Sequence, residues 1–495
     1  MKINIAKRLE QLKEERNEVR TTTRKSSIFR QLLAGCTANL TLINVGLQFG
    51  WPTVSLPTLQ DEKAEIHVTS SEGAWIVSFL LVGACLGPVI SVNLVNSIGR
   101  KWTLLLTVIP SIGSWVLVYY AKDAQMFCIA RFIGGIALGS TFATVPMYVG
   151  EIAEKETRGA LGSVVCIMIS LGIILICVLG PFFTIPIMSL IATGSSLIFM
   201  ITFIWMPETP YYYLTKRKYK EAERALIWLR RRRDVDLELQ EMCILTRKEV
   251  RLEGGIKELI KTRGNRLATL IVLVTFGAQE MAGFTAITAY SGLILQGIAD
   301  EIDPGIVITA GGVVTLIFFF LASFIIDKIG RKLLMFLSAV GDILCLVLMG
   351  LYFQLRSKDT EDVNCMFWLL VVPLLALQAF YAIGLGPVPW AIVSELYPLN
   401  VKASATMVFS IYSSILSFFT CKLYQVVTDQ WGEPVVFYSC ATIEVIFIGL
   451  AMFIVFETKG KSFKEIQDRL NGIHRKEITS PDKAKLFIVD SPSND

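Results

Sequence analysis

The stretch Ile98-Gly99-Arg100-Lys101 reappears in the second half of the chain as Ile329-Gly330-Arg331-Lys332. Each copy lies between the second and third apolar blocks of a series of six, and glycine permits a tight turn there. Other paired motifs follow in the same order: Glu151 before Arg158 and Glu395 before Lys402, then Pro207-Glu208-Thr209 and Phe456-Glu457-Thr458. This ordered set indicates an internal repeat, so we expect two related halves.

Long apolar blocks surround both copies of this turn. The 495 residues are 53% apolar and only 18% charged, with a mean hydropathy of +0.56, whereas soluble domains carry about 25% charged residues. Lipid requires helices, because no water is there to satisfy the backbone, and a span needs about 20 residues. The blocks are 31–57, 74–96, 102–121, 126–149, 160–182, 183–206, 267–297, 305–326, 332–353, 366–393, 404–427 and 434–456. We expect an all-α polytopic membrane protein with twelve transmembrane helices in two pseudo-symmetric six-helix halves.

The polar segments divide the chain and orient it. The tails, the two Gly-Arg-Lys turns and the central loop are rich in Lys and Arg, whereas the alternate connections are acidic. Because basic loops stay in the cytoplasm, we expect both termini inside a multi-pass protein of the plasma membrane. The expected units are a cytoplasmic N-terminal tail (1–30), a first six-helix half (31–210), a cytoplasmic central loop (211–266), a second six-helix half (267–457) and a cytoplasmic C-terminal tail (458–495).

Metal and catalytic chemistry find little support in the sequence. Eight of the ten cysteines lie inside apolar blocks, where they are typical small buried residues rather than a disulfide framework. His67 and His474 are the only histidines, and neither has a metal-ligand neighbour at a useful spacing. No nucleophile–base pair or phosphate-binding loop is present. We therefore expect neither an enzyme nor a bound metal or cofactor.

Specific motifs accompany this architecture. The first half contains Arg131-Phe-Ile-Gly-Gly135, Pro146-Met-Tyr-Val-Gly-Glu-Ile-Ala153 and Arg158-Gly159. The second half contains Gly384-Leu-Gly-Pro-Val-Pro-Trp390, Glu395-Leu-Tyr-Pro398 and Glu457-Thr-Lys-Gly-Lys-Ser462. With this ordered set the chain resembles the sugar porter family of the major facilitator superfamily over nearly its whole length. Pro207-Glu-Thr-Pro-Tyr-Tyr-Tyr-Leu214 and Phe463-Lys-Glu-Ile-Gln467 are most similar to insect facilitated trehalose transporters. The resemblance implies the major facilitator fold.

The resemblance also implies a sugar site between the halves. Hydroxyl-matching polar groups and an aromatic face are what such a site needs, and prolines and glycines at 384–389 are expected to break a helix beside it. The substrate-binding residues carried over are Phe49, Thr53, Cys166, Gln279, Glu280, Thr285, Tyr381, Trp390, Ser413 and Ser417. Cys166 and Glu280 replace glutamines usual in the family, and Thr285, Ser413 and Ser417 replace asparagines of hexose facilitators, so the resemblance leaves the sugar undefined.

Glu280 admits two interpretations. A carboxylate at mid-membrane is costly unless it is paired or solvated, so Glu280 is either protonated and able to donate a hydrogen bond, or ionised in a wet cavity. Both stay open at this point.

A second group of charges lies at the cytoplasmic motifs. In the family such charges hold the cytoplasmic side closed, while the alternative interpretation is that basic loops only set topology. The cytoplasmic gate residues carried over are Arg100, Arg131, Glu151, Arg158, Asp327, Arg331, Lys332, Glu395 and Lys402. Asn96 and Ser97 stand where the family has an acid and a base, so we expect a weaker gate in the first half.

The leading functional hypothesis is facilitated diffusion of trehalose or a hexose by alternating access. The expected partners are a small sugar and the lipid bilayer, with no nucleic acid. The sequence does not define the oligomeric state. Proton symport is a second hypothesis, disfavoured because Pro52 stands where family symporters carry an aspartate. A third hypothesis is a sensor derived from a transporter. It is suggested by the replacement of glutamines and asparagines that the family usually carries at the site.

Overall fold

The computed structural model describes residues 28–471, except for 155–156, 233, 252–254, 359–365, 398 and 462. The described residues form helices and contain no β-strand. Eleven helices are long and apolar enough to cross a membrane, and Val164–Leu179 adds a shorter apolar helix, which together match the twelve expected spans. The all-α polytopic architecture is confirmed.

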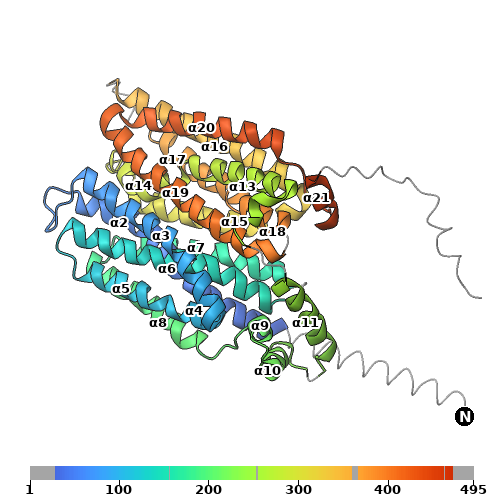
Figure 1. The fold of residues 1–495 in the computed structure, drawn as a ribbon. Coiled ribbons are helices and arrows are strands. Elements are labelled where there is room, and N and C mark those ends of the chain that lie inside the picture. Colours follow the sequence, from blue (N-terminus) through green and yellow to red (C-terminus); the bar gives the residue numbers. More distant parts are fainter. Residues whose placement is uncertain are drawn as a thin grey trace, which may run out of the picture.

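The first half contains seven labelled helices (Figure 1). A helical segment over 28–39 leads through a turn at Leu40 into the first of them. They are α2 (Thr41–Leu59), α3 (Ser70–Ile98), α4 (Arg100–Leu106), α5 (Val108–Tyr119), α6 (Ala124–Ile152), α7 (Arg158–Leu179) and α8 (Ile185–Phe203). α4 and α5 are consecutive parts of one span.

The second half contains eight labelled helices. They are α13 (Arg263–Met281), α14 (Phe284–Gln296), α15 (Pro304–Ile329), α16 (Arg331–Arg356), α17 (Trp368–Ile383), α18 (Val388–Leu396), α19 (Leu399–Trp431) and α20 (Glu433–Ile454). Two spans are broken, because α13 with α14 and α17 with α18 are each two helices of one span. The short helices outside the spans are α9 (Pro210–Thr215), α10 (Tyr219–Arg230), α11 (Asp236–Arg251), α12 (Glu258–Lys261) and α21 (Phe463–Leu470).

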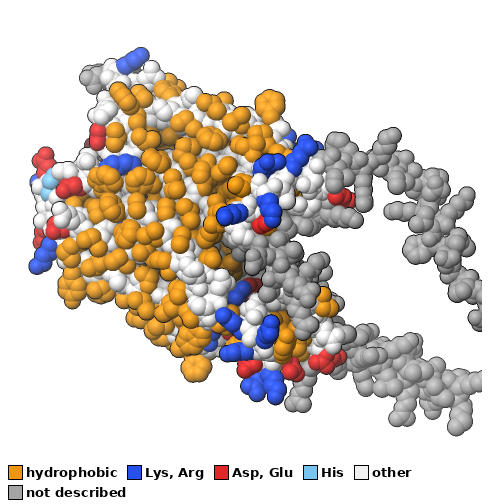
Figure 2. All heavy atoms as spheres, viewed as in Figure 1, with side chains coloured by type: hydrophobic (Ala, Val, Ile, Leu, Met, Phe, Trp, Pro, Cys, Tyr) orange, Lys and Arg blue, Asp and Glu red, His pale blue; other side chains and the backbone are white. Residues whose placement is uncertain are grey.

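Two ends of the bundle differ in charge. The end with the Gly99 and Gly330 turns also carries α9–α11 and α21 in Figure 1, and we call it the basic end; the opposite end, with the acidic connections, is the acidic end. Figure 2 shows hydrophobic side chains covering the flank between these ends, with Lys, Arg, Asp and Glu gathered at the ends. Ile109 of α5, Phe324 of α15 and Phe453 of α20 are among the exposed apolar side chains of the spans. A continuous apolar surface of this kind is what lipid solvates.

Glycines bring helices of the first half into backbone contact. A side chain at Gly46 of α2 would collide with the Ile169 carbonyl of α7, and one at Gly83 of α3 would collide with the Phe132 carbonyl of α6. Small residues at such crossings let helices approach closely, which is how packing replaces the hydrophobic effect inside lipid. The pairs α2–α7 and α3–α6 are accordingly tightly packed.

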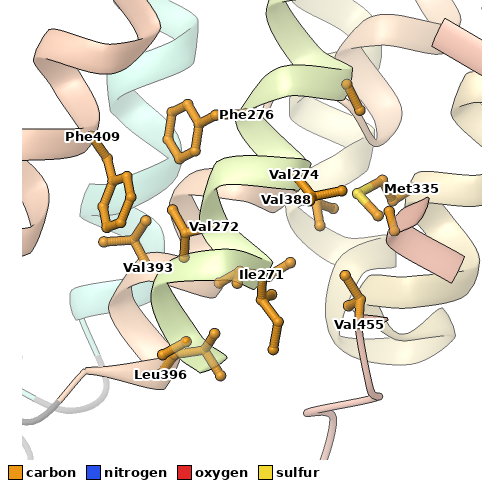
Figure 3. Close-up of a cluster of buried hydrophobic side chains, with 14 of the residues drawn as sticks. Ile271, Val272, Val274, Phe276, Met335, Val388, Val393, Leu396, Phe409 and Val455 are labelled. Atoms are coloured by element: carbon orange, nitrogen blue, oxygen red, sulfur yellow. The ribbon is translucent and has the colours of Figure 1, made fainter. Parts of the chain in front are cut away.

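A core of branched and aromatic side chains holds the second half together near the basic end. Figure 3 shows Val272 and Phe276 of α13 directed toward Phe409 of α19 and Val393 of α18. The Phe276 and Phe409 rings stack at 6.2 Å between centroids. This core fixes α13 and α18, the two helix pieces that carry the candidate site.

Candidate functional site

Two helix breaks face each other in the second half. α13 ends at Met281, and Gly283 adopts a φ of +81°, a left-handed conformation that favours glycine, before α14 begins. The second break lies between Ile383 and Val388, as the glycines and prolines there predict. At Gly384 a side chain would meet the Leu334 carbonyl of α16, so the chain passes close to that helix. Broken helices at mid-membrane expose polar backbone to a cavity, where transporters bind substrate.

Gln279 joins the two breaks. Its Nε2 donates a hydrogen bond to Tyr381 Oη at 3.0 Å and reaches the Gly386 carbonyl at 3.5 Å. Its Oε1 is buried and has no hydrogen-bond partner within the described residues. Because a buried acceptor left unsatisfied is costly, this oxygen favours a ligand that supplies a hydroxyl.

Glu280 is held by hydroxyl groups of α19. Ser413 Oγ and Ser417 Oγ each donate to one of its carboxyl oxygens at 2.5 Å, and Thr420 Oγ1 donates to its carbonyl at 3.3 Å. Thr285 of α14 also lies close enough to interact with the carboxyl group. The structure therefore brings together the four polar residues that the sequence analysis placed in the second half of the site beside Gln279.

Aromatic rings surround this polar group. Tyr381 stacks on Phe284 with parallel rings 3.6 Å apart. Trp390, half-buried, meets Phe276 edge to face at 4.9 Å and stacks at 6.2 Å on Phe142 of α6. Trp390 thus contacts both halves of the molecule.

The first-half residues contribute unequally. Thr53 Oγ1 donates to the Thr288 carbonyl of α14 at 2.6 Å, so this hydroxyl joins the halves rather than facing a free cavity. Phe49 packs against apolar clusters of both halves. Cys166 of α7 is half-buried and lies close enough to Tyr381 for an electrostatic interaction.

The two halves meet on the acidic side of this site. α3 packs against α19, α2 against α14 and α7 against α15. Near the acidic end, Lys422 Nζ lies 4.0 Å from the centre of the Trp75 ring, and Trp75 contacts Phe418 at 6.4 Å. By contrast, the ion pairs Arg100–Glu151 and Arg331–Glu395 at the basic end each join residues of a single half. We infer that this conformation is closed at the acidic end.

The basic end contains two equivalent charge clusters. Arg100 pairs with Glu151 at 2.8 Å, and Arg331 pairs with Glu395 at the same distance. Lys332 Nζ donates to the Met452 carbonyl, and Lys402 Nζ donates to the Ser394 carbonyl. The side chains of Arg158 and Asp327 lie outside the described part of the chain.

Each cluster includes a carboxylate that the list of gate residues lacks. Glu208 accepts the backbone N–H groups of Arg100 and Lys101, and Glu457 accepts those of Arg331 and Lys332, at 2.9–3.1 Å. A carboxylate at a helix N-terminus satisfies free donors and the helix dipole. Their repeated position after the sixth span of each half is the sequence feature that could have identified them as members of these clusters.

The two capping carboxylates differ in environment. Burial raises the pKa of Glu208 despite its backbone donors. Burial acts the same way at Glu457, but the backbone N–H groups of Lys459, Arg331, Lys332 and Thr458 together outweigh it and lower its pKa. The second-half cluster therefore favours the charged form more strongly.

Arg131 is not part of the basic end. It lies eight residues from the N-cap Asp123 of α6, toward the acidic end, whereas Glu151 is 20 residues further along, about 30 Å at 1.5 Å per residue. Its Nη1 donates to the Gln48 carbonyl and to Gln48 Oε1, each at 2.7 Å, and its guanidinium lies over the Trp51 ring. The sequence-based placement of Arg131 among the basic-end charges is therefore corrected, because the length of α6 separates it from Glu151.

Comparison with known proteins identifies the family of this chain. The model of the family described as "Sugar (and other) transporter" matches residues 13–470. The chain belongs to this family. The chain is 28% identical over 470 residues to the facilitated trehalose transporter Tret1 of Bombyx mori, covering 94% of this chain and 91% of that protein. It is also 28% identical over 447 residues to Tret1 of Apis mellifera ligustica, covering 89% and 88% of the two chains.

Solved structures of the superfamily share the fold. The partially occluded inward-open xylose transporter from E. coli superposes with a TM-score of 0.73 at 20% identity, covering 88% of this chain and 100% of that one. The proton:xylose symporter bound to 6-bromo-6-deoxy-D-glucose gives a TM-score of 0.71 at 19% identity, covering 90% and 100%. The major facilitator fold is thereby confirmed.

The two basic-end clusters should differ in stability. Glu395 Oε2 accepts a hydrogen bond from Thr458 Oγ1 at 2.6 Å, whereas Glu151 Oε2 has no partner in the described part of the chain. We expect Glu395→Gln to lower the thermal unfolding midpoint a few degrees more than Glu151→Gln. The reason is that the Glu395 carboxylate accepts more hydrogen bonds, so its substitution removes more interactions. Unfolding of both variants in one lipid mixture measures this, and equal midpoints would contradict the asymmetry.

Proposed function

We propose that this protein is a facilitative transporter of trehalose or a hexose that works by alternating access across the plasma membrane. In this proposal the basic end faces the cytoplasm, as do both termini, because basic loops are retained there. The fold supports it, since two six-helix halves with a site between them are the architecture of alternating access.

The single observation that carries the proposal is the unpartnered Oε1 of Gln279 between two helix breaks. A sugar hydroxyl would donate to this oxygen and relieve a buried, unsatisfied acceptor. The Tyr381 hydroxyl on the other side of the same amide fixes its orientation. The site thus selects a ligand with hydroxyl donors rather than an apolar one.

Aromatic faces suit the other side of a sugar. The C–H face of a pyranose ring packs on flat aromatic surface, and the half-buried Trp390 supplies such a surface beside Gln279. Tyr381 and Phe284 add a second, parallel pair of rings.

Uniport is favoured over symport by the first span. Pro52 of α2 is buried and has no ionisable group, so it cannot carry a proton at the position where family symporters have an aspartate. The relatives compared above are named as facilitated transporters. Glu280 is a carboxyl group at the candidate site and can bind a proton, so proton coupling should be measured.

Uptake of labelled trehalose and glucose into oocytes, with and without a proton gradient, tests this proposal. We expect saturable uptake that a proton gradient does not drive uphill. Gln279→Leu should lose uptake at unchanged surface expression, whereas Gln354→Leu, an exposed residue on α16, should retain it. No uptake of either sugar despite surface expression would favour the sensor hypothesis, and uphill accumulation driven by protons would favour symport.

Glu280→Gln should preserve sugar uptake and flatten its pH dependence. An amide keeps the size of the side chain and still bonds Ser413 and Ser417, and the ionised carboxyl is an acceptor only. As external pH rises, more Glu280 ionises without a counter-cation, so wild-type uptake should fall. Initial rates at several pH values compare the two proteins. One common profile would show that Glu280 does not titrate during transport.

A further inference from the structure

Two carboxyl groups are buried in the second half away from the helix breaks. Asp342 of α16 is 1% exposed and Glu444 of α20 is 0% exposed. None of their four carboxyl oxygens has a hydrogen-bond partner within the described residues. The transport hypothesis assigns them no role. Buried polar atoms without partners are rare in proteins, and unpartnered carboxylates are the most costly of them.

The helix register places these two groups together. α16 and α20 run antiparallel and pack along their length. Tyr438 Oη bonds Gln354 Oε1 at 2.8 Å toward the acidic end, and Lys332 Nζ bonds the Met452 carbonyl at 2.7 Å toward the basic end. Asp342 and Glu444 lie between these two contacts, and their carboxyl groups interact electrostatically.

Among the described residues, no positively charged group interacts with the pair. The titratable groups that interact with it are the thiols of Cys345 on α16 and Cys440 on α20, and the Tyr381 hydroxyl of α17. From α13, Glu280 acts on the same Tyr381 and adds only negative charge. Among the described side chains of α15, α18 and α19, no charged group interacts with either carboxyl. Two ionised carboxylates would therefore repel each other in a medium of low dielectric constant.

We propose that Asp342 and Glu444 form a proton-binding site that holds at least one proton at neutral pH, and that loss of this proton weakens the packing of α16 on α20. Protonation removes the like-charge repulsion and gives one carboxyl an O–H donor. The site lies within the second half, so it forms whether or not sugar is bound.

The proton site also borders the candidate sugar site. Asp342 interacts with Tyr381, whose hydroxyl accepts the hydrogen bond from Gln279. Ionisation of the pair would change the field at that hydroxyl. This link rests on the proposed function, whereas the proton site itself does not.

Infrared spectroscopy and thermal unfolding of the full chain in lipid nanodiscs test the proposal. At neutral pH the wild type should show the carbonyl stretch of protonated carboxylic acids. The double variant Asp342→Asn/Glu444→Gln should lose one component of this band, and that component should remain in Glu280→Gln. The unfolded chain releases these protons at ordinary acidic pH, so the folded state binds more protons and stability falls as pH rises. The wild-type midpoint should drop by several degrees from neutral to alkaline pH, and the double variant should not show this drop.

Controls separate the possible outcomes. Glu301→Gln, at an exposed carboxyl group between α14 and α15, should keep the wild-type pH dependence. Each single amide variant should show a reduced drop, which guards against a double variant that fails to fold.

Identical infrared bands in the wild type and the double variant would overturn the proposal. Stabilisation of the wild type by sodium chloride at alkaline pH, absent from the double variant, would also overturn it in favour of a metal cation. A protein that takes up no sugar refutes the proposed function and leaves these measurements unchanged.

Discussion

Replacing Gly292 with leucine should reduce sugar uptake to background while the protein still folds. A Cβ atom at Gly292 of α14 would collide with the Thr53 carbonyl oxygen of α2 and lie 2.8 Å from Pro57 Cγ. Backbone atoms cannot yield as a flexible side chain can, so the halves could not close at the acidic end. The clash lies between halves, and each half keeps its own core. A transporter held in one state cannot complete an alternating cycle.

Uptake and thiol labelling measure this effect together. Cys85 of α3 is half-buried and its thiol faces the Ile411 carbonyl of α19 at 4.0 Å. In Gly292→Leu a membrane-impermeant thiol reagent added at the acidic side should label Cys85, and a Cys85→Ser background should lose that label. Gly449→Leu is the matched control, because a side chain there meets no atom within 4 Å. Normal uptake by Gly292→Leu would contradict closure through this contact.

Trp390→Ala should lower the uptake rate about tenfold at unchanged surface expression. The indole contacts Phe276 in its own half and Phe142 in the other, and each aromatic pair contributes about 0.5–1.5 kcal/mol beyond its area. The ring also supplies the flat face proposed for the sugar. Since about 1.4 kcal/mol corresponds to a factor of ten, loss of both contacts accounts for the expected decrease.

A second tryptophan provides the control for this substitution. Trp368 at the start of α17 is 56% exposed on the flank of the bundle, so Trp368→Ala should leave the uptake rate close to wild type. Trp390→Phe should recover part of the activity, because a smaller aromatic face remains. Unchanged kinetics in Trp390→Ala would show that the indole only fills space.

The linear sequence determined much of this architecture. Twelve apolar blocks, the two copies of Gly-Arg-Lys and the break around Gly384 predicted the spans and their repetition, and the structure has them. These features are local, because span length, backbone freedom and average polarity belong to one stretch of chain. The resemblance also brought Gln279, Glu280 and Tyr381 to one site, where the structure shows them bonded or adjacent.

Tertiary packing decided which residues from distant parts of the chain contact each other, and no single stretch of sequence contains that information. Arg131 looked like a gate residue in the motif, yet its position along α6 pairs it with Gln48 near the acidic end. The contact of Glu280 with Ser413 and Ser417 joins residues more than 130 positions apart. Asp342 and Glu444 lie in separate apolar blocks of the sequence, and the antiparallel register of α16 and α20 brings them together. Hydropathy predicts that a helix crosses the membrane, but the rotation of that helix against its neighbours, set by packing, decides which polar groups meet.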